Sequence, residues 1–189
     1  MNHVMLSLVR RRPRDMVNLL RDAATCAYKK HHVRIESEDI RDVMPQYSQG
    51  CLVEICTEYG NEIANLKELL MMIPRNRKER ALLKKDKSVF STSEINARLK
   101  KIRGEAKLFF KGSFAPVTAD DLRCFLYRIG FLTAREMKGG KPDWTFYEDE
   151  WILGDVRVDK GKDWEIHPAY RFAIGDEESL RVVNRLRAK

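Results

Sequence analysis

The sequence predicts a mainly α-helical protein whose second half is α+β, and three kinds of signal support this class. The N-terminal third has apolar residues at helical spacing, beginning where Pro13 suits a first helical turn. Farther along, Ser91 with Glu94 and Thr118 with Asp121 have the spacing of capping boxes before amphipathic runs. Aromatic and β-branched segments then flank a two-glycine turn, which is typical of a β-hairpin.

The first part of the chain, residues 10–73, is expected to form a bundle of four helices. Ser37 is the expected cap of the second helix. Pro45 should break that helix, because proline lacks the N–H that a helix interior needs. The fourth helix is the most apolar and should stop at Pro74, after which a basic linker covers residues 74–90.

Residues 91–175 are expected to form a second module, and residues 176–189 a closing helix. Gly104 should end or loosen the first capped helix. Gly130 should end the second, because glycine favours the backbone conformation that follows a helix. The glycine pair at positions 139–140 then joins two strand-like segments. Two helices followed by a hairpin with a glycine-rich tip is the order of a winged helix, in which the second helix enters the major groove of DNA.

Positive charge is concentrated in one part of the chain. The whole chain has a net charge of +8, and residues 74–111 carry 13 basic and 4 acidic residues, a net charge of +9. A local excess of this kind creates a field that a polyanion can use, although a solvated basic surface would give the same pattern. The candidate DNA-contacting residues lie on both capped helices and at the hairpin tip: Arg98, Lys100, Lys101, Arg103, Arg123, Tyr127, Arg128, Lys138 and Lys141.

Several function classes lack their sequence signatures. The four cysteines form no CxxC pair and read as reduced thiols of a cytosolic protein. The histidines have no paired spacing with these cysteines, so no metal site is expected. No apolar run reaches the roughly 18 residues that span a bilayer, so we expect a cytoplasmic protein. The phosphate-loop pattern Gly-x-x-x-x-Gly-Lys-Ser/Thr is absent. We therefore predict no catalytic residue, no cofactor and no ATP hydrolysis by this chain alone.

A series of short motifs in one order resembles a known family. Arg12-Pro13-Arg14-Asp15 opens the first helix, and the segments at 126–132 and 166–170 follow much later. These motifs resemble the lid and winged-helix region after the core of bacterial P-loop ATPases of the STAND/AAA+-related group. The resemblance implies that Arg12 and Arg14 reach the nucleotide phosphates held by an ATPase core, since guanidinium groups bind phosphate with forked donors. Pairing of both arginines with acidic residues of that core is the alternative.

Three functions fit these features. The preferred one is a non-catalytic regulatory module that couples the nucleotide state of an ATPase core to double-stranded DNA or to a protein partner. The second is a free-standing winged-helix transcriptional regulator, which requires a dimer and a basic recognition face. The third is a protein-interaction scaffold that binds no nucleic acid. An oligomer is compatible with all three.

Overall fold

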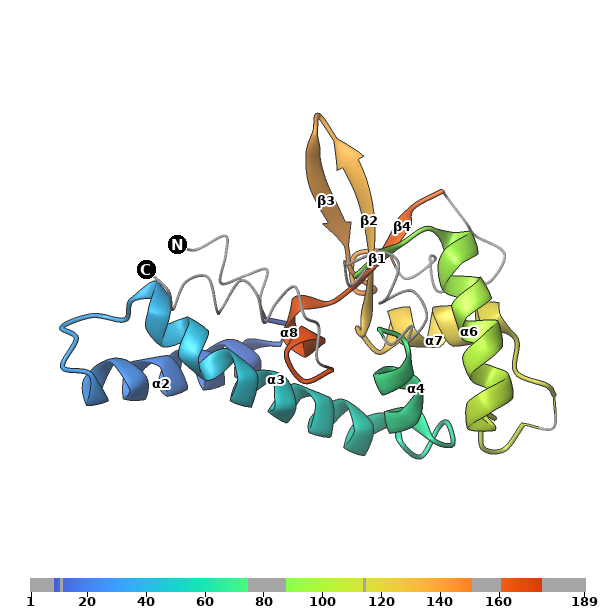
Figure 1. Ribbon diagram of the computed structural model, residues 1–189, viewed down its shortest axis with the longest axis horizontal. Helices are drawn as coiled ribbons and strands as arrows, with labels where there is room; N and C mark the ends of the chain where they lie inside the picture. The colour runs from blue at the N-terminus through green and yellow to red at the C-terminus, as the bar shows by residue number, and fades with distance from the viewer. Residues whose placement is uncertain (1–8, 11, 75–87, 114, 151–160, 175–189) are drawn as a thin grey trace, which may run out of the picture. The chain divides into compact units, whose positions relative to one another are not determined.

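A computed structural model describes residues 9–10, 12–74, 88–113, 115–150 and 161–174 of the chain (Figure 1). The chain divides into two compact units: unit 1 is Met1–Val53 with His167–Lys189, and unit 2 is Glu54–Ile166. This division differs from the expected modules, because the fourth helix of the expected bundle belongs to unit 2. Residues after the sheet return to unit 1. Most of the expected linker and the expected closing helix lie outside the described residues.

Unit 1 is helical. It contains α2 (Pro13–Lys29), the first part of α3 (Ser37–Tyr59) and the short α8 (Pro168–Arg171). Its buried apolar side chains come from all three helices, with Leu19, Tyr47 and Tyr170 among them. The segment after α8 is fastened to α3 by a hydrogen bond, in which the Ala173 backbone N–H donates to Ser48 Oγ at 3.0 Å.

The expected break at Pro45 is wrong, because α3 continues through this residue to Tyr59. A proline inside a helix removes one backbone hydrogen bond and costs about 3 kcal/mol. Burial outweighs that cost here, since one stripe of α3 stays covered on both sides of the proline. This stripe consists of Ile40, Met44, Tyr47 and Cys51. Ser37 is itself helical, and the Glu36 N–H is bound by the Asp39 carboxylate, so the expected serine cap is also wrong.

Unit 2 combines helices with a small antiparallel sheet. Its elements are α4 (Leu66–Met72), β1 (Val89–Phe90), α6 (Thr92–Ala106), α7 (Ala119–Arg128), β2 (Leu132–Lys138), β3 (Lys141–Thr145) and β4 (Asp163–Ile166). Helix α6 packs against α4 and α7. Side chains from these helices and from the sheet form the core of the unit, with Leu99, Leu126 and Trp164 at its centre.

Both predicted capping boxes are present. The Ser91 hydroxyl accepts from the Glu94 N–H before α6, and Thr118 accepts from the Asp121 N–H before α7. Helix α6 continues past Gly104 to Ala106, so the first of the two expectations for that glycine, an end of the helix, is wrong. Burial of Ala106 adds favourable packing to the last turn. Gly130 follows α7 with φ of 73°, as predicted for a residue that ends a helix.

The sheet has the strand order β1-β4-β2-β3. Strands β2 and β3 form the predicted hairpin, in which Lys138 pairs with Lys141 beside the glycine turn. Strand β4 pairs with Leu132–Arg135 only, so the rest of the hairpin extends past it, as Figure 1 shows. A sequence-distant strand therefore separates β1 from the hairpin.

The mainly α, α+β class is confirmed: a helical N-terminal region precedes a part that contains both helices and a four-stranded antiparallel sheet. The expected helix pair and hairpin are present in unit 2, and the winged-helix assignment itself stays a prediction. None of the described helices is both long and apolar enough to cross a membrane.

Candidate functional site

The outward face expected for α7 is wrong for two of its three residues and right for Arg128. Arg123 and Tyr127 were expected to face DNA, yet they are 1% and 0% exposed. The Arg123 guanidinium lies 4.8 Å from the centre of the Trp164 ring and donates to Asp120 Oδ1 at 3.0 Å. The Tyr127 hydroxyl donates to the Glu150 carbonyl at 3.1 Å. A second side of α7 is covered by the sheet, so these two polar side chains became part of the core.

The remaining cation of α7 and one cation of the hairpin tip are paired with acids. Arg128 is exposed and forms an ion pair with Glu62. Lys138 pairs with Glu136 and with Asp143, and the hydrogen bonds to these two carboxylates raise the pKa of the lysine. Lys141, on the other side of the turn, is exposed. The hairpin tip therefore presents mixed charge.

The four candidate cations of α6 divide into two pairs. Arg98 donates to the Ile73 carbonyl and lies 4.8 Å from the centre of the Phe90 ring. Arg103 donates to the Val117 carbonyl at 2.7 Å. Both arginines thus fasten neighbouring segments of unit 2, and both are half-buried. Lys100 and Lys101 are exposed and remain candidates for a phosphate contact.

One face of the hairpin combines apolar residues with a single arginine, and the sequence did not reveal it as a site. The pairing register places Met137, Pro142 and Trp144 on the same side, and we call these three residues the hairpin face. Arg135 lies on that side too, opposite Trp144, and donates to Met137 Sδ at 3.4 Å. Met137 is 56% exposed and Trp144 is 38% exposed. The indole N–H of Trp144 donates to Glu165 Oε2 at 2.7 Å, so the ring is held in place while part of it stays open to solvent. Alternation along the strands was the sequence signal for this face.

The motif that opens α2 contains a buried ion pair. Arg10 Nε and Nη2 donate to the two oxygens of Asp15 at 2.6 and 3.0 Å, and both residues are buried. Arg10 also lies against Tyr170. Arg12 is the half-buried N-cap residue of α2, and Arg14 is exposed in its first turn. Asp15 of the motif Arg12-Pro13-Arg14-Asp15 therefore pairs with Arg10, which precedes the motif.

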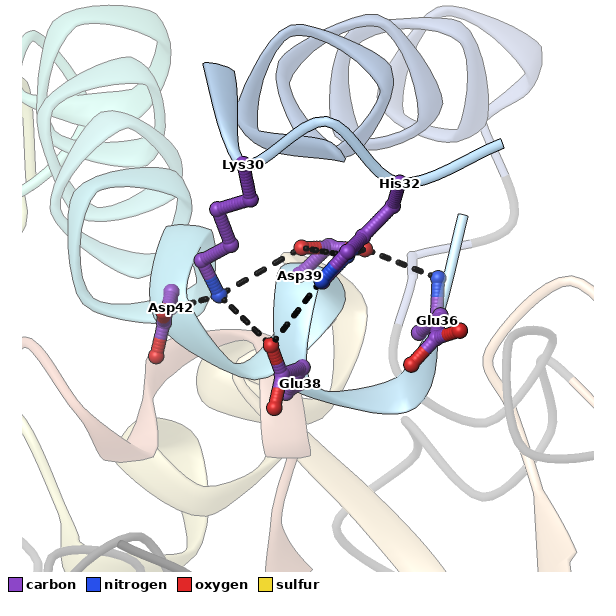
Figure 2. Close-up of polar contacts among 6 residues, drawn as sticks. All are labelled: Lys30, His32, Glu36, Glu38, Asp39 and Asp42. Atoms are coloured by element: carbon purple, nitrogen blue, oxygen red, sulfur yellow. Dashed lines mark hydrogen bonds and ion pairs between the residues drawn. The ribbon is translucent and has the colours of Figure 1, made fainter. Parts of the chain in front are cut away.

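A second polar group joins the end of α2 to the start of α3, and we call it the α2–α3 latch: Lys30, His32, Glu38, Asp39 and Asp42 (Figure 2). Lys30 Nζ lies 2.8 Å from Asp42 Oδ2, 3.1 Å from Glu38 Oε1 and 3.4 Å from Asp39 Oδ1. His32 Nδ1 lies 2.9 Å from Asp39 Oδ2. The His32 contact crosses a loop, and a contact of that kind leaves no periodic pattern in the sequence.

Hydrogen bonding within the latch shifts three pKa values, and the bonds to Asp42, Glu38 and Asp39 raise that of Lys30. Burial by itself raises the pKa of Asp39, but hydrogen bonds from His32, the Glu36 N–H and Lys30 outweigh it and lower the pKa to about 2. The hydrogen bond to Asp39 raises the pKa of His32. Charged His32 beside ionised Asp39 is therefore the favoured pairing.

Part of the latch also has metal-ligand spacing. The ligand atoms of His32, Glu38 and Asp39 lie within 4.8 Å of one another. Figure 2 shows the Lys30 ammonium among the carboxylates, with dashed lines to Glu38, Asp39 and Asp42. The Lys30 ammonium therefore already supplies positive charge among the carboxylates, where a metal ion would otherwise do so. The latch therefore reads as a structural clamp.

Comparison with known proteins gives one partial likeness. Residues 1–56 match the model of a family described as a FunZ-associated C-terminal helical domain. The match covers 56 of the 189 residues, which include α2, the latch and most of α3, and it is consistent with a C-terminal domain of a larger protein. No curated protein and no solved structure matches the chain.

Proposed function

We propose that this chain is a non-catalytic regulatory module of a larger P-loop ATPase, and that it acts by binding a protein partner. Two observations support its place in a larger protein. The N-terminal motifs resemble the lid region of STAND/AAA+-related ATPases, and residues 1–56 match a family described as C-terminal. In this proposal Arg12 and Arg14, at the N-terminal end of α2, contact the ATPase core, either at the nucleotide phosphates or at acidic residues.

The exposed hairpin face carries the proposal of a protein partner. Met137 and Trp144 present apolar surface to solvent on an element that extends past its neighbouring strand. Methionine and tryptophan are enriched at protein interfaces, and tryptophan is frequent among the residues that dominate binding energy. A partner that covers this face would remove two large apolar side chains from water.

Helix α7 gives further support to a protein partner, because the residues in its first turn do not suit contact with DNA. A recognition helix usually meets the major groove with its N-terminal residues. Here the first turn of α7 contains Asp120 and Asp121, whose carboxylates repel phosphate. The burial of Arg123 and Tyr127 removes the two side chains that would have read bases. A free-standing DNA-binding transcriptional regulator is therefore the weaker alternative.

A second candidate function is sequence-independent contact with the DNA backbone, favoured by exposed Lys100, Lys101 and Lys141. Three phosphate contacts would give a slope of about −2.7 for the logarithm of the binding constant against the logarithm of salt concentration. Lys100→Glu/Lys101→Glu should then abolish most binding to duplex DNA. On the preferred proposal, the unmodified chain shows no such slope and the double variant changes nothing.

Site-specific photo-cross-linking separates the two candidates in cells that express the chain. A benzophenone amino acid replaces Met137 on the hairpin face or, in a matched variant, exposed Lys100 on α6. We expect a discrete protein adduct from position 137 and none from position 100. A DNA adduct from position 100, with no protein adduct from position 137, would overturn the preferred function. Purified chain with Mg-ATP should release no phosphate above the buffer rate, and turnover would overturn its non-catalytic character.

A further inference from the structure

Helix α2 has two apolar stripes, and only one of them faces the core of unit 1. The inner stripe consists of Leu19, Ala23 and Ala27, all buried. The second, which we call the outer stripe, consists of exposed residues at spacings of three, four and four: Val17, Leu20, Ala24 and Tyr28. Val17 is 63% exposed, Leu20 39% and Tyr28 82%.

The outer stripe is continuous, which distinguishes it from scattered surface apolar residues. At 3.6 residues per turn its four members fall within about 80° of one another around the helix axis, over more than three turns. Single exposed apolar residues are ordinary on protein surfaces, but contiguous ones mark interaction sites. Leu20 and Ala24 belong to the same apolar pattern in the sequence as buried Leu19 and Ala23, yet both are exposed.

One edge of the outer stripe is basic. Arg14 and Arg21 are both exposed, and they lie three residues before and four residues after Val17, on the same side of it. The side chain of Arg21 is 68% exposed, and its contact with neighbouring Asp22 is a surface pair at 3.2 Å. Such a pair contributes little, so the edge keeps its positive character.

We infer that the outer stripe of α2 is a docking surface for an amphipathic helix of another protein region, one with an apolar stripe and carboxylates along its edge. This inference rests on the proposed function as a partner-binding module. Helices commonly recognise one another through apolar residues at spacings of three and four, and flanking charges select the partner. The match to the model of a family described as a FunZ-associated C-terminal helical domain covers α2 entirely, and it is consistent with a domain of a larger protein.

A second copy of the chain fits this surface poorly. In a symmetric antiparallel pair of α2 helices, the edge that contains Arg14 and Arg21 would face its own equivalent. Like charges would then oppose one another along the contact. A parallel pair would supply no row of carboxylates either, since Asp15 is buried and paired with Arg10. A partner helix with an acidic edge offers apolar contact to the outer stripe and opposite charge to its basic edge.

The test uses two synthetic helical peptides with the full chain. Both peptides have leucines at spacings of three and four; one has glutamates along its edges and the other has lysines there. Binding of each labelled peptide is measured by fluorescence anisotropy at low and high salt. We expect the glutamate peptide to bind and the lysine peptide to bind at least about tenfold more weakly. Equal binding of the two peptides, or failure of the glutamate peptide to bind, would overturn the inference.

Variants of the chain locate the binding. Leu20→Ser/Tyr28→Ser should weaken binding of the glutamate peptide by about 30-fold, and Arg21→Glu should remove its advantage over the lysine peptide. Val33→Ser, at an exposed apolar residue outside the helix, is the matched control and should leave binding unchanged. A wild-type dimer in sedimentation that Leu20→Ser/Tyr28→Ser converts to monomer would identify a second copy as the occupant and overturn the inference. If the peptide test fails while position 137 still cross-links to protein, the inference of a docking surface on α2 is wrong but the proposed function stands.

Discussion

Replacing Asp15 with asparagine should strongly destabilise unit 1. The carboxylate of Asp15 is 2% exposed, and it accepts two hydrogen bonds from Arg10, which is 5% exposed. Asp15→Asn removes the negative charge and leaves the arginine charge buried. Loss of one partner of a buried ion pair costs about 3–5 kcal/mol, and Asp15 also loses a favourable position in the first turn of α2, worth about 0.3–1 kcal/mol.

Urea denaturation followed by circular dichroism measures this loss. With a dependence on urea of about 1–3 kcal/mol per molar, a loss of 3 kcal/mol lowers the transition midpoint by about 1–3 M. Tryptophan fluorescence is recorded in parallel, because all three tryptophans of the sequence fall in unit 2. The matched control is Asp22→Asn, which removes an exposed pair with Arg21 and should change stability by less than about 0.5 kcal/mol.

A double replacement distinguishes the ion pair from a general need for polarity at this place. Arg10→Met/Asp15→Leu removes both charges together and fills similar volume with apolar atoms. Such replacements of buried pairs are often neutral or stabilising, so the double variant should be far more stable than Asp15→Asn alone. The reasoning is refuted if Asp15→Asn behaves like the Asp22→Asn control. It is equally refuted if the double variant loses as much stability as the single one.

Five further changes test other parts of the structure by urea denaturation. Thr118→Ala should cost about 1 kcal/mol by removing the cap of α7, and Gly140→Ala about 1–2 kcal/mol because φ is 77° there. Arg123→Met should be neutral or stabilising, since two guanidinium nitrogens have no hydrogen-bond partner among the described residues; a large loss would contradict this. The lowered pKa of Asp39, about 2, means that its contribution is present above about pH 4 and disappears as the pH falls toward 2, a dependence that Asp39→Asn should remove. The raised pKa of His32 has the opposite sign: its contribution is complete below about pH 6.5 and is lost as the pH rises through the folded value, and His32→Gln should flatten that profile.

Local signals in the sequence predicted local structure well. The Ser91 and Thr118 capping boxes are present, because a cap involves residues only three apart and depends little on the rest of the fold. Gly130 ends α7, and the glycine pair forms the hairpin turn, since positive φ values are a property of the residues themselves. Where a local rule failed, packing outweighed it, as in the helix that continues through Pro45.

Features that depend on distant partners could not be read from periodicity. Strand β4 inserts between β1 and β2, and no short-range pattern encodes that order. The same strand brings Trp164 beside Arg123, so a cation expected on the surface stacks in the core. Lys138 illustrates the converse: it is exposed as expected, but Asp143 on the opposing strand already binds it. A count of basic residues therefore overestimated the charge available to DNA.

The arrangement of α2 explains how a helix can expose an apolar stripe without turning it inward. Charged contacts hold both ends of the helix: buried Asp15 binds Arg10 at the start, and partly exposed Lys30 binds the carboxylates of α3 just after the end. These contacts act together with the packing of buried Leu19, Ala23 and Ala27 to set the rotation of α2 about its own axis. With the rotation fixed, Tyr28 and its neighbours must face outward, and they do so from a rigid element. Binding surfaces on rigid elements lose less conformational entropy on association than surfaces on loops. The buried ion pair and the latch are therefore the structural basis of the proposed docking surface, although neither touches the partner.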